Sequence, residues 1–238
     1  MFSAYGYLRS KDDAASAEPK RHREVSIKFE AIAGGCTWFP LGTANEVFAF
    51  KWPPFGDISV QYTTSPDLVR VVTIYRETGR AVDAIYMERR LADVDGERIA
   101  FHDALFVSEV LRAQQCGFAT EMLRRCIPYY GHLGIRRVII PSAVEAGRIV
   151  WPKFGFRPSE LANASFSEYV AALHKAKLGT ELDEPVPHNG PGLLDFRGSY
   201  GFAIGRLALQ TFSGLTLELD LTDQDTIRCL KERGIQIL

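Results

Sequence analysis

Cysteine is scarce in this chain of 238 residues, and its four cysteines show neither CxxC spacing nor the density of a disulfide-stapled domain. A chain of this length buries enough apolar surface to fold without disulfides or a structural metal, so we expect free thiols. Cys116 and Cys126, if they lie in and beside one helix, are about 14 Å apart and too distant to bridge.

Long hydrophobic runs are also missing. No stretch of about 18 apolar residues occurs, which predicts no membrane span, and the start of the chain lacks the basic-then-apolar order of a signal peptide. Zinc-finger spacing, P-loop, HExxH and GxSxG patterns are absent, which argues against several hydrolase and nucleotidase classes and predicts no metal site. We therefore expect a cytoplasmic protein.

Net charge is nearly zero, with 28 basic against 29 acidic residues, but it is unevenly distributed. Residues 112–157 carry eight basic and two acidic side chains, a net charge of +6, which leaves −7 elsewhere. This excess indicates either a solvated basic face or a site for a phosphorylated or nucleic-acid ligand. Nucleic acid is the weaker option, because aromatic and basic residues do not alternate as they do in stacking platforms.

The first part of the chain predicts a flexible arm followed by antiparallel strands. Residues 1–24 form the arm, since residues 9–24 have no apolar period. Short segments rich in aromatic and β-branched residues follow, separated by turn signals. The predicted strands are Val25–Ala31, Glu46–Lys51, Asp57–Tyr62, Leu68–Tyr75, Ala81–Glu88 and Arg98–Ser108.

Beyond residue 110 the apolar period becomes helical over Gly117–Tyr130, and a buried strand at Val138–Ile140 and a second helix at Ser142–Val150 follow. In residues 159–238 we expect a helix preceded by a Ser165/Glu168 capping box, a Pro185–Tyr200 loop, a strand at Leu215–Leu221 and a final helix capped by Thr222. The predicted class is α+β: a mixed, mostly antiparallel sheet flanked by helices, in a domain over residues 25–158 with a C-terminal extension or small appended lobe.

The segment most informative about chemistry is Gln114–Ala119, between a predicted strand and a predicted helix. Gly117 lets the backbone approach a phosphate, and the free N–H groups of the helix's first turn can hold it. A glycine that merely permits a tight turn is the competing interpretation. About forty residues later the chain reads Trp151-Pro152-Lys153-Phe154-Gly155-Phe156.

This order and these two motifs resemble the GNAT superfamily of N-acetyltransferases. Gln114, Gly117 and Ala119 match its acyl-CoA signature [Q/R]-x-x-G-x-[G/A], and Trp151–Phe156 resembles its closing Tyr-x-Lys-x-Gly-Phe motif. The resemblance implies a GNAT-like fold in which the pantetheine arm of an acyl-CoA pairs with a splayed strand and the pyrophosphate sits on the helix N-terminus. The cofactor-binding residues it implies are Phe106, Val107, Val110, Leu111, Arg112, Gln114, Gln115, Cys116, Gly117, Phe118, Ala119, Thr120, Arg148 and Trp151.

Acyl transfer to an amine needs a base, an oxyanion donor and an acid for the departing thiolate. The resemblance implies that Glu109, at the strand end, is the base, with His102 and Asp103 as second candidates. Trp151 stands where the family has a tyrosine acid, so Tyr129, Tyr130, Ser142 or a water must supply that proton.

The sequence therefore predicts an acyl-CoA-dependent N-acyltransferase that uses acetyl-CoA and an amine of a small molecule or protein. The alternative is a catalytically silent GNAT-like module that binds acyl-CoA or a protein partner. The acceptor stays open, as does the oligomeric state, for which a homodimer is one option.

Overall fold

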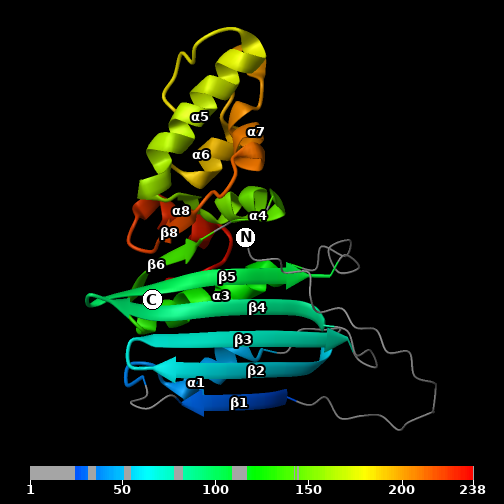
Figure 1. Cartoon of the computed structure of the whole chain (residues 1–238), viewed down its shortest axis with the longest axis vertical. Coiled ribbons are helices and arrows are strands. Elements are labelled where there is room, and N and C mark those ends of the chain that lie inside the picture. Colours follow the sequence, from blue (N-terminus) through cyan, green and yellow to red (C-terminus); the bar gives the residue numbers. More distant parts are fainter. Residues whose placement is uncertain are drawn as a thin grey trace, which may run out of the picture.

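The computed structural model describes residues 25–31, 36–50, 55–77, 83–108, 117–141, 143 and 145–237. Its strands form one mixed sheet in the order β1-β2-β3-β4-β5-β6-β8-β7 (Figure 1). The described strands are β1 (Val25–Ala31), β2 (Phe55–Ser65), β3 (Leu68–Glu77), β4 (Asp83–Val94), β5 (Glu97–Val107), β6 (Ile135–Ile140), β7 (Arg157–Pro158) and β8 (Leu217–Asp220). Parallel pairing occurs between β1 and β2 and between β5 and β6, and the other strand pairs of the described residues are antiparallel. The predicted mixed, mostly antiparallel sheet with flanking helices is confirmed.

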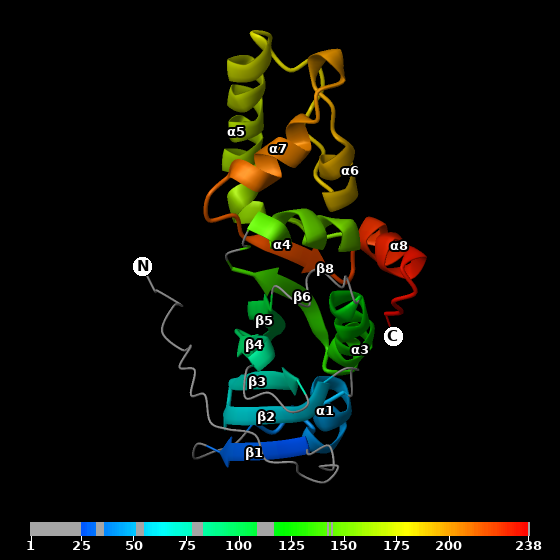
Figure 2. The ribbon, with the colours of Figure 1, turned by 90° about the vertical axis from the view of Figure 1, so that its right-hand side faces the viewer.

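The helices of the described residues are α1 (Leu41–Phe48), α3 (Phe118–His132), α4 (Glu145–Val150), α5 (Glu160–Leu178), α6 (Gly190–Asp195), α7 (Ile204–Thr211) and α8 (Gln224–Glu232). Two 3-10 turns are η1 (Trp151–Phe154) and η2 (Ser199–Gly201). Figure 2 shows α1 and α3 on the same side of the sheet. No helix in this part of the chain combines the length and apolar character that a bilayer crossing requires.

One part of the core lies between α1, α3 and the sheet face that they cover, which we call the inner face, and the same buried cluster continues through η1 into α5, α6 and α7. Strand alternation directs every second residue of β2, β3 and β4 to the inner face, and these residues are almost all fully buried. In β4 the inward series is Ile85, Met87, Arg89 and Leu91. A charged residue therefore occupies a position that the pattern reserves for apolar side chains.

Several predicted elements are wrong in type or boundary. The first half of the expected strand Glu46–Lys51 is the end of helix α1, because Ala44, Val47 and Phe48 recur at helical spacing and are all buried. Residues 49 and 50 follow the helix without forming a strand, and residue 51 lies outside the described residues. Helix α5 begins at Glu160, well before the Ser165/Glu168 capping box.

Two further boundaries in the C-terminal region differ from the prediction. The Pro185–Tyr200 loop contains α6, which Asn189 caps by accepting a hydrogen bond from the Gly192 N–H at 2.6 Å. Asp223 rather than Thr222 caps α8, since its carboxylate accepts from the Thr226 N–H at 2.9 Å. In both cases the side chain that closes the first turn decides where the helix begins.

The C-terminal region contributes both to the sheet and to a helical group beyond its end. β8 lies between β6 and β7 and pairs antiparallel with each, so the chain leaves the sheet after β7, forms α5, α6 and α7, and returns (Figure 2). Two glycines allow close backbone contact within this group. A Cβ on Gly190 would meet the carbonyl oxygens of Phe156 and Pro152, and one on Gly205 would meet the carbonyl of Leu193.

Replacing Gly205 with Ala tests this packing. The new methyl group would collide with the Leu193 carbonyl and lie 2.9 Å from the Phe196 Cβ, so we expect a loss of about 1 to 3 kcal/mol in the free energy of unfolding. Gly42→Ala in α1 is the matched control: its Cβ would meet no atom within 4 Å, and it should gain about 0.5 to 1 kcal/mol. Denaturant unfolding measures both, and equal stability of Gly205→Ala and wild type would contradict this packing.

Candidate functional site

The strands β5 and β6 pair over a short stretch and then separate. Their parallel register runs from Arg98 opposite Ile135 to Phe101 opposite Ile139, after which β6 keeps β8 as its partner. Except for one bulged residue, residues 102–107 of β5 pair with β4 on one side, and no strand of the described residues pairs with their other side. This part of β5 is therefore an internal edge whose outward N–H and C=O groups can accept an added strand.

A β-bulge lies where the two strands part. Glu88 of β4 is opposite Ala104, whereas Arg89 is opposite His102, so Asp103 has no partner of its own. Such an extra residue bends its strand and increases the local twist. Asp103 turns to the outer face of the sheet, where Arg90 donates to both its carboxylate oxygens at 2.6 and 2.8 Å.

The N-terminus of α3 begins at Gly117, ten residues beyond the last residue of β5. Gly117 is the N-cap with φ of 70°, in the left-handed region that favours glycine, and a Cβ there would meet no atom within 4 Å. Phe118 anchors the first turn, because its ring stacks on Phe50 at 5.5 Å and meets Tyr75 edge-on at 5.3 Å. The first-turn N–H groups of a helix have no intrahelical acceptor and can bind an anion.

The structure describes only some of the predicted binding residues. Phe106, half-exposed at 52 %, and Val107 lie on the unpaired part of β5, and Gly117, Phe118, Ala119 and Thr120 form the start of α3. Eight further predicted site residues lie outside the described residues: Glu109, Val110, Leu111, Arg112, Gln114, Gln115, Cys116 and Ser142.

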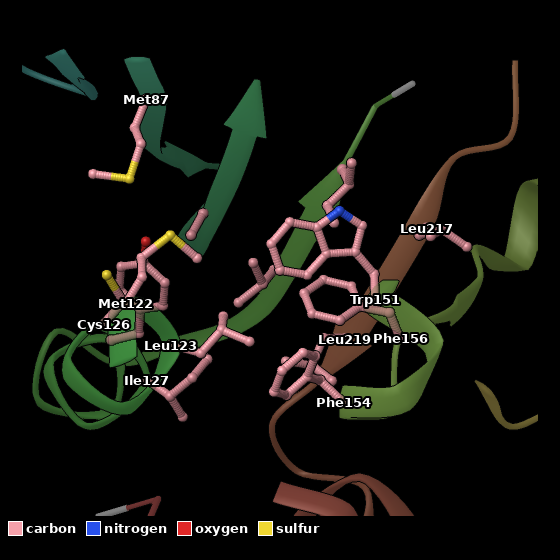
Figure 3. Packing of buried hydrophobic residues seen from close by; sticks show 14 of the residues in the cluster. Met87, Met122, Leu123, Cys126, Ile127, Trp151, Phe154, Phe156, Leu217 and Leu219 are labelled. Atoms are coloured by element: carbon pink, nitrogen blue, oxygen red, sulfur yellow. The ribbon is translucent and has the colours of Figure 1, made fainter. Parts of the chain in front are cut away.

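Arg148 and Trp151 both belong to the packing around α4. The Arg148 guanidinium donates to the carbonyls of Ala143, Gln210 and Phe212 at 2.7, 3.0 and 2.6 Å, and so ties α4 to the end of α7. A phosphate at Arg148 would compete with these three bonds. Trp151 is 7 % exposed. Figure 3 shows its indole beside Phe154 and Phe156, whose rings lie 6.4 and 5.6 Å away.

Tyr130, predicted as an acid, is fully buried under the sheet. A hydrogen bond of 2.9 Å joins its hydroxyl to Nε2 of His102. Burial raises the pKa of Tyr130 well above its ordinary value and lowers that of His102 well below 6.5, with the Arg89 charge contributing to the His102 shift. The phenol stays protonated and the imidazole stays neutral. Tyr129 donates instead to the Pro40 carbonyl at 3.3 Å.

Several of the basic side chains in residues 112–157 form ion pairs or hydrogen bonds within the protein. Arg124 and Arg125 both bind Glu121, and Arg137 binds Glu97 with two bonds of 2.6 Å. Together with the carbonyl contacts of Arg148, these pairs favour a solvated, internally paired face over a continuous phosphate-binding stripe.

The residue that the sequence analysis missed is Arg89. It is 2 % exposed, although the inward phase of Ile85, Met87 and Leu91 could have indicated its position. Among the described residues no group of three or more His, Cys, Asp or Glu side chains could hold a metal ion, and Cys36, Cys126 and Cys229 are free thiols. No protein-family model matches the chain, and no curated protein matches its sequence.

Because His102 is buried in its neutral form, we expect the folded protein to lose stability at acidic pH. Because the folded pKa is lowered, the unfolded chain binds a proton below pH 6.5 that the folded protein does not, and the free energy of unfolding falls with pH by up to about 1.4 kcal/mol per unit. His102→Gln should remove this slope between about pH 6.5 and 5, whereas His132→Gln at the exposed end of α3 should retain it. Urea unfolding across this range provides the measurement, and an unchanged slope in His102→Gln would contradict the assignment.

Proposed function

We propose that the chain is an acyl-CoA-dependent N-acyltransferase of the GNAT type, with acetyl-CoA as donor. The observation that carries the proposal is the coincidence of two features: an unpaired strand edge on β5 and a helix that begins at Gly117 with a left-handed backbone. The edge suits the amides of a pantetheine arm, and the first-turn N–H groups of α3, which the N-cap Gly117 does not bind with a side chain, suit a pyrophosphate. The alternation of strand, helix, strand and helix from β5 to α4 supports the same proposal.

In this proposal the acyl group lies where the strands part. A ligand that adds to residues 102–107 of β5 ends at the last paired residues, Phe101 and Ile139. His102 is next to that point, but its Nε2 already binds Tyr130, and the Asp103 carboxylate is held by Arg90. Glu109 thus stays the proposed base, which accepts the amine proton directly or through water.

The silent binding module is the second candidate, and two observations favour it. The Tyr130 hydroxyl is fully buried and its pKa is raised, so it is a poor source of a proton for a thiolate. The Trp151 indole is packed among aromatic rings and has no acidic proton to give. An active enzyme would then take the proton from Ser142 or from water.

Binding of acetyl-CoA is tested with a pair of glycine variants. Gly117→Glu would place a carboxylate at the proposed pyrophosphate site, so the rise in melting temperature that millimolar acetyl-CoA gives the wild type should disappear. Gly179→Glu is the matched control: its φ is 73° against 70° for Gly117, neither Cβ would meet an atom within 4 Å, and it ends α5. Gly179→Glu should keep the full shift, and a wild type without any shift would overturn the proposal.

The two candidate functions separate in a CoA-release assay with a panel of amines. If Glu109 removes the amine proton, Glu109→Gln should lower turnover by about 10²- to 10⁴-fold while the affinity for acetyl-CoA stays the same. Glu184→Gln, an exposed residue of the C-terminal region, should keep wild-type turnover. Undiminished turnover in Glu109→Gln would assign the role of the base to His102, Asp103 or water. Tight binding of acetyl-CoA by the wild type without CoA release would favour the silent module.

A further inference from the structure

Arg89 is a buried cation with unused hydrogen-bond donors. Its Nη2 donates to the Met87 sulfur at 3.3 Å, and its guanidinium carbon lies 5.6 Å from the centre of the Phe48 ring. Its Nε and Nη1 have no hydrogen-bond partner, although both are fully buried. Arginine does not lose its proton in proteins, so this side chain carries a full positive charge inside the core.

No carboxylate balances that charge in the described part of the chain. The acidic residues beside Arg89 on β4 and on the neighbouring β5, Glu88 and Asp103, lie on the outer face and bind Arg70 and Arg90. The inward groups whose charge states respond to Arg89 are Tyr75, His102, Cys126 and Tyr130. Burial keeps these four neutral, so an unpaired buried charge remains, which destabilises the folded state unless a counter-charge is supplied.

A second side chain with an unused hydrogen-bonding group lies in line with Arg89 across the strands of the sheet. The register places Tyr62 opposite Val71, Val71 opposite Arg89, and Arg89 opposite His102, all directed to the inner face. The Tyr62 hydroxyl is fully buried and has no partner. The Phe48 ring lies close to both side chains: its centre is 6.5 Å from the centre of the Tyr62 ring and 5.6 Å from the guanidinium carbon of Arg89.

We infer that Arg89 and Tyr62 bind a small monovalent anion, a halide or a carboxylate of formate size, in the core beneath α1 and α3. Arg89 has two unused N–H groups and a fixed positive charge, which excludes a cation, and the Tyr62 hydroxyl can donate a third hydrogen bond. One negative charge neutralises one guanidinium. The enclosure by Phe48 and the sheet favours a small ion. His102 is the most exposed of the four residues in this line across the sheet, at 7 %, so the anion enters its binding site from the point where β5 leaves β6. The inference does not depend on acyl transfer.

The test compares melting temperatures of the full chain in chloride, in formate and in methanesulfonate, a bulky reference anion, at constant ionic strength. The wild type should gain on the order of 5 to 10 °C at a hundredfold excess over the dissociation constant of its preferred anion. Arg89→Met should lose this response and melt at or above the wild type in methanesulfonate, because it removes an unpaired buried charge. Chloride and formate curves distinguish a halide site from a carboxylate site.

Two further measurements keep the result decisive if Arg89→Met does not fold. Tyr62→Phe should shift half-saturation by about tenfold, whereas Tyr169→Phe in α5 should leave it unchanged. A crystal grown in bromide, or in formate if formate is preferred, should show the anion within hydrogen-bonding distance of Arg89 Nε or Nη1. Equal anion responses in wild type and Arg89→Met, or a crystal at saturating anion without density beside Arg89, would overturn the inference.

Discussion

The separation of β5 from β6 is the constraint on which the rest of the molecule depends. β6 has two partners, and the antiparallel pairing with β8, from Arg137 opposite Asp220 to Ile140 opposite Leu217, directs it away from β5. The bulge at Asp103 bends β5 at the same level. The C-terminal strand thus helps to create the internal edge beside α3, and residues remote in sequence shape the candidate site.

The C-terminal region is fixed to the centre of the molecule at several independent points. Besides β8, two hydrogen bonds from Arg148 to the Gln210 and Phe212 carbonyls connect α4 to the end of α7, and the close approach of Gly190 to Pro152 and Phe156 connects α6 to η1. His174, fully buried in α5, joins the Thr180 carbonyl and the Ser199 N–H through its two ring nitrogens. These contacts hold α5, α6 and α7 against one another and against α4 and η1.

Alternation and helical spacing are local properties, and they predicted the four strands β2 to β5 and helix α3. The boundaries were less accurate, since β4 continues to Val94, beyond its predicted end at Glu88. The prediction failed at Glu46–Lys51, where a segment rich in aromatic residues forms α1 through contacts with distant strands and with Tyr129. The position of Gly117 at a helix start was predictable, whereas the insertion of β8 beside β6 was not, since strand order depends on packing between distant segments. The burial of Arg89 without a partner was not predicted, because the residues next to a charged side chain in a strand do not show whether a counter-charge from a distant segment lies beside it.

Hydrogen exchange with and without acetyl-CoA tests the central claim most directly, because it follows the unpaired edge of β5 amide by amide. The account predicts that acetyl-CoA slows exchange at the amides of residues 102–107 that point away from β4 and at the first turn of α3, while the amides of β2 and β3 exchange as before. Saturating acetyl-CoA that leaves β5 and α3 unchanged, or that protects a surface elsewhere, would contradict it.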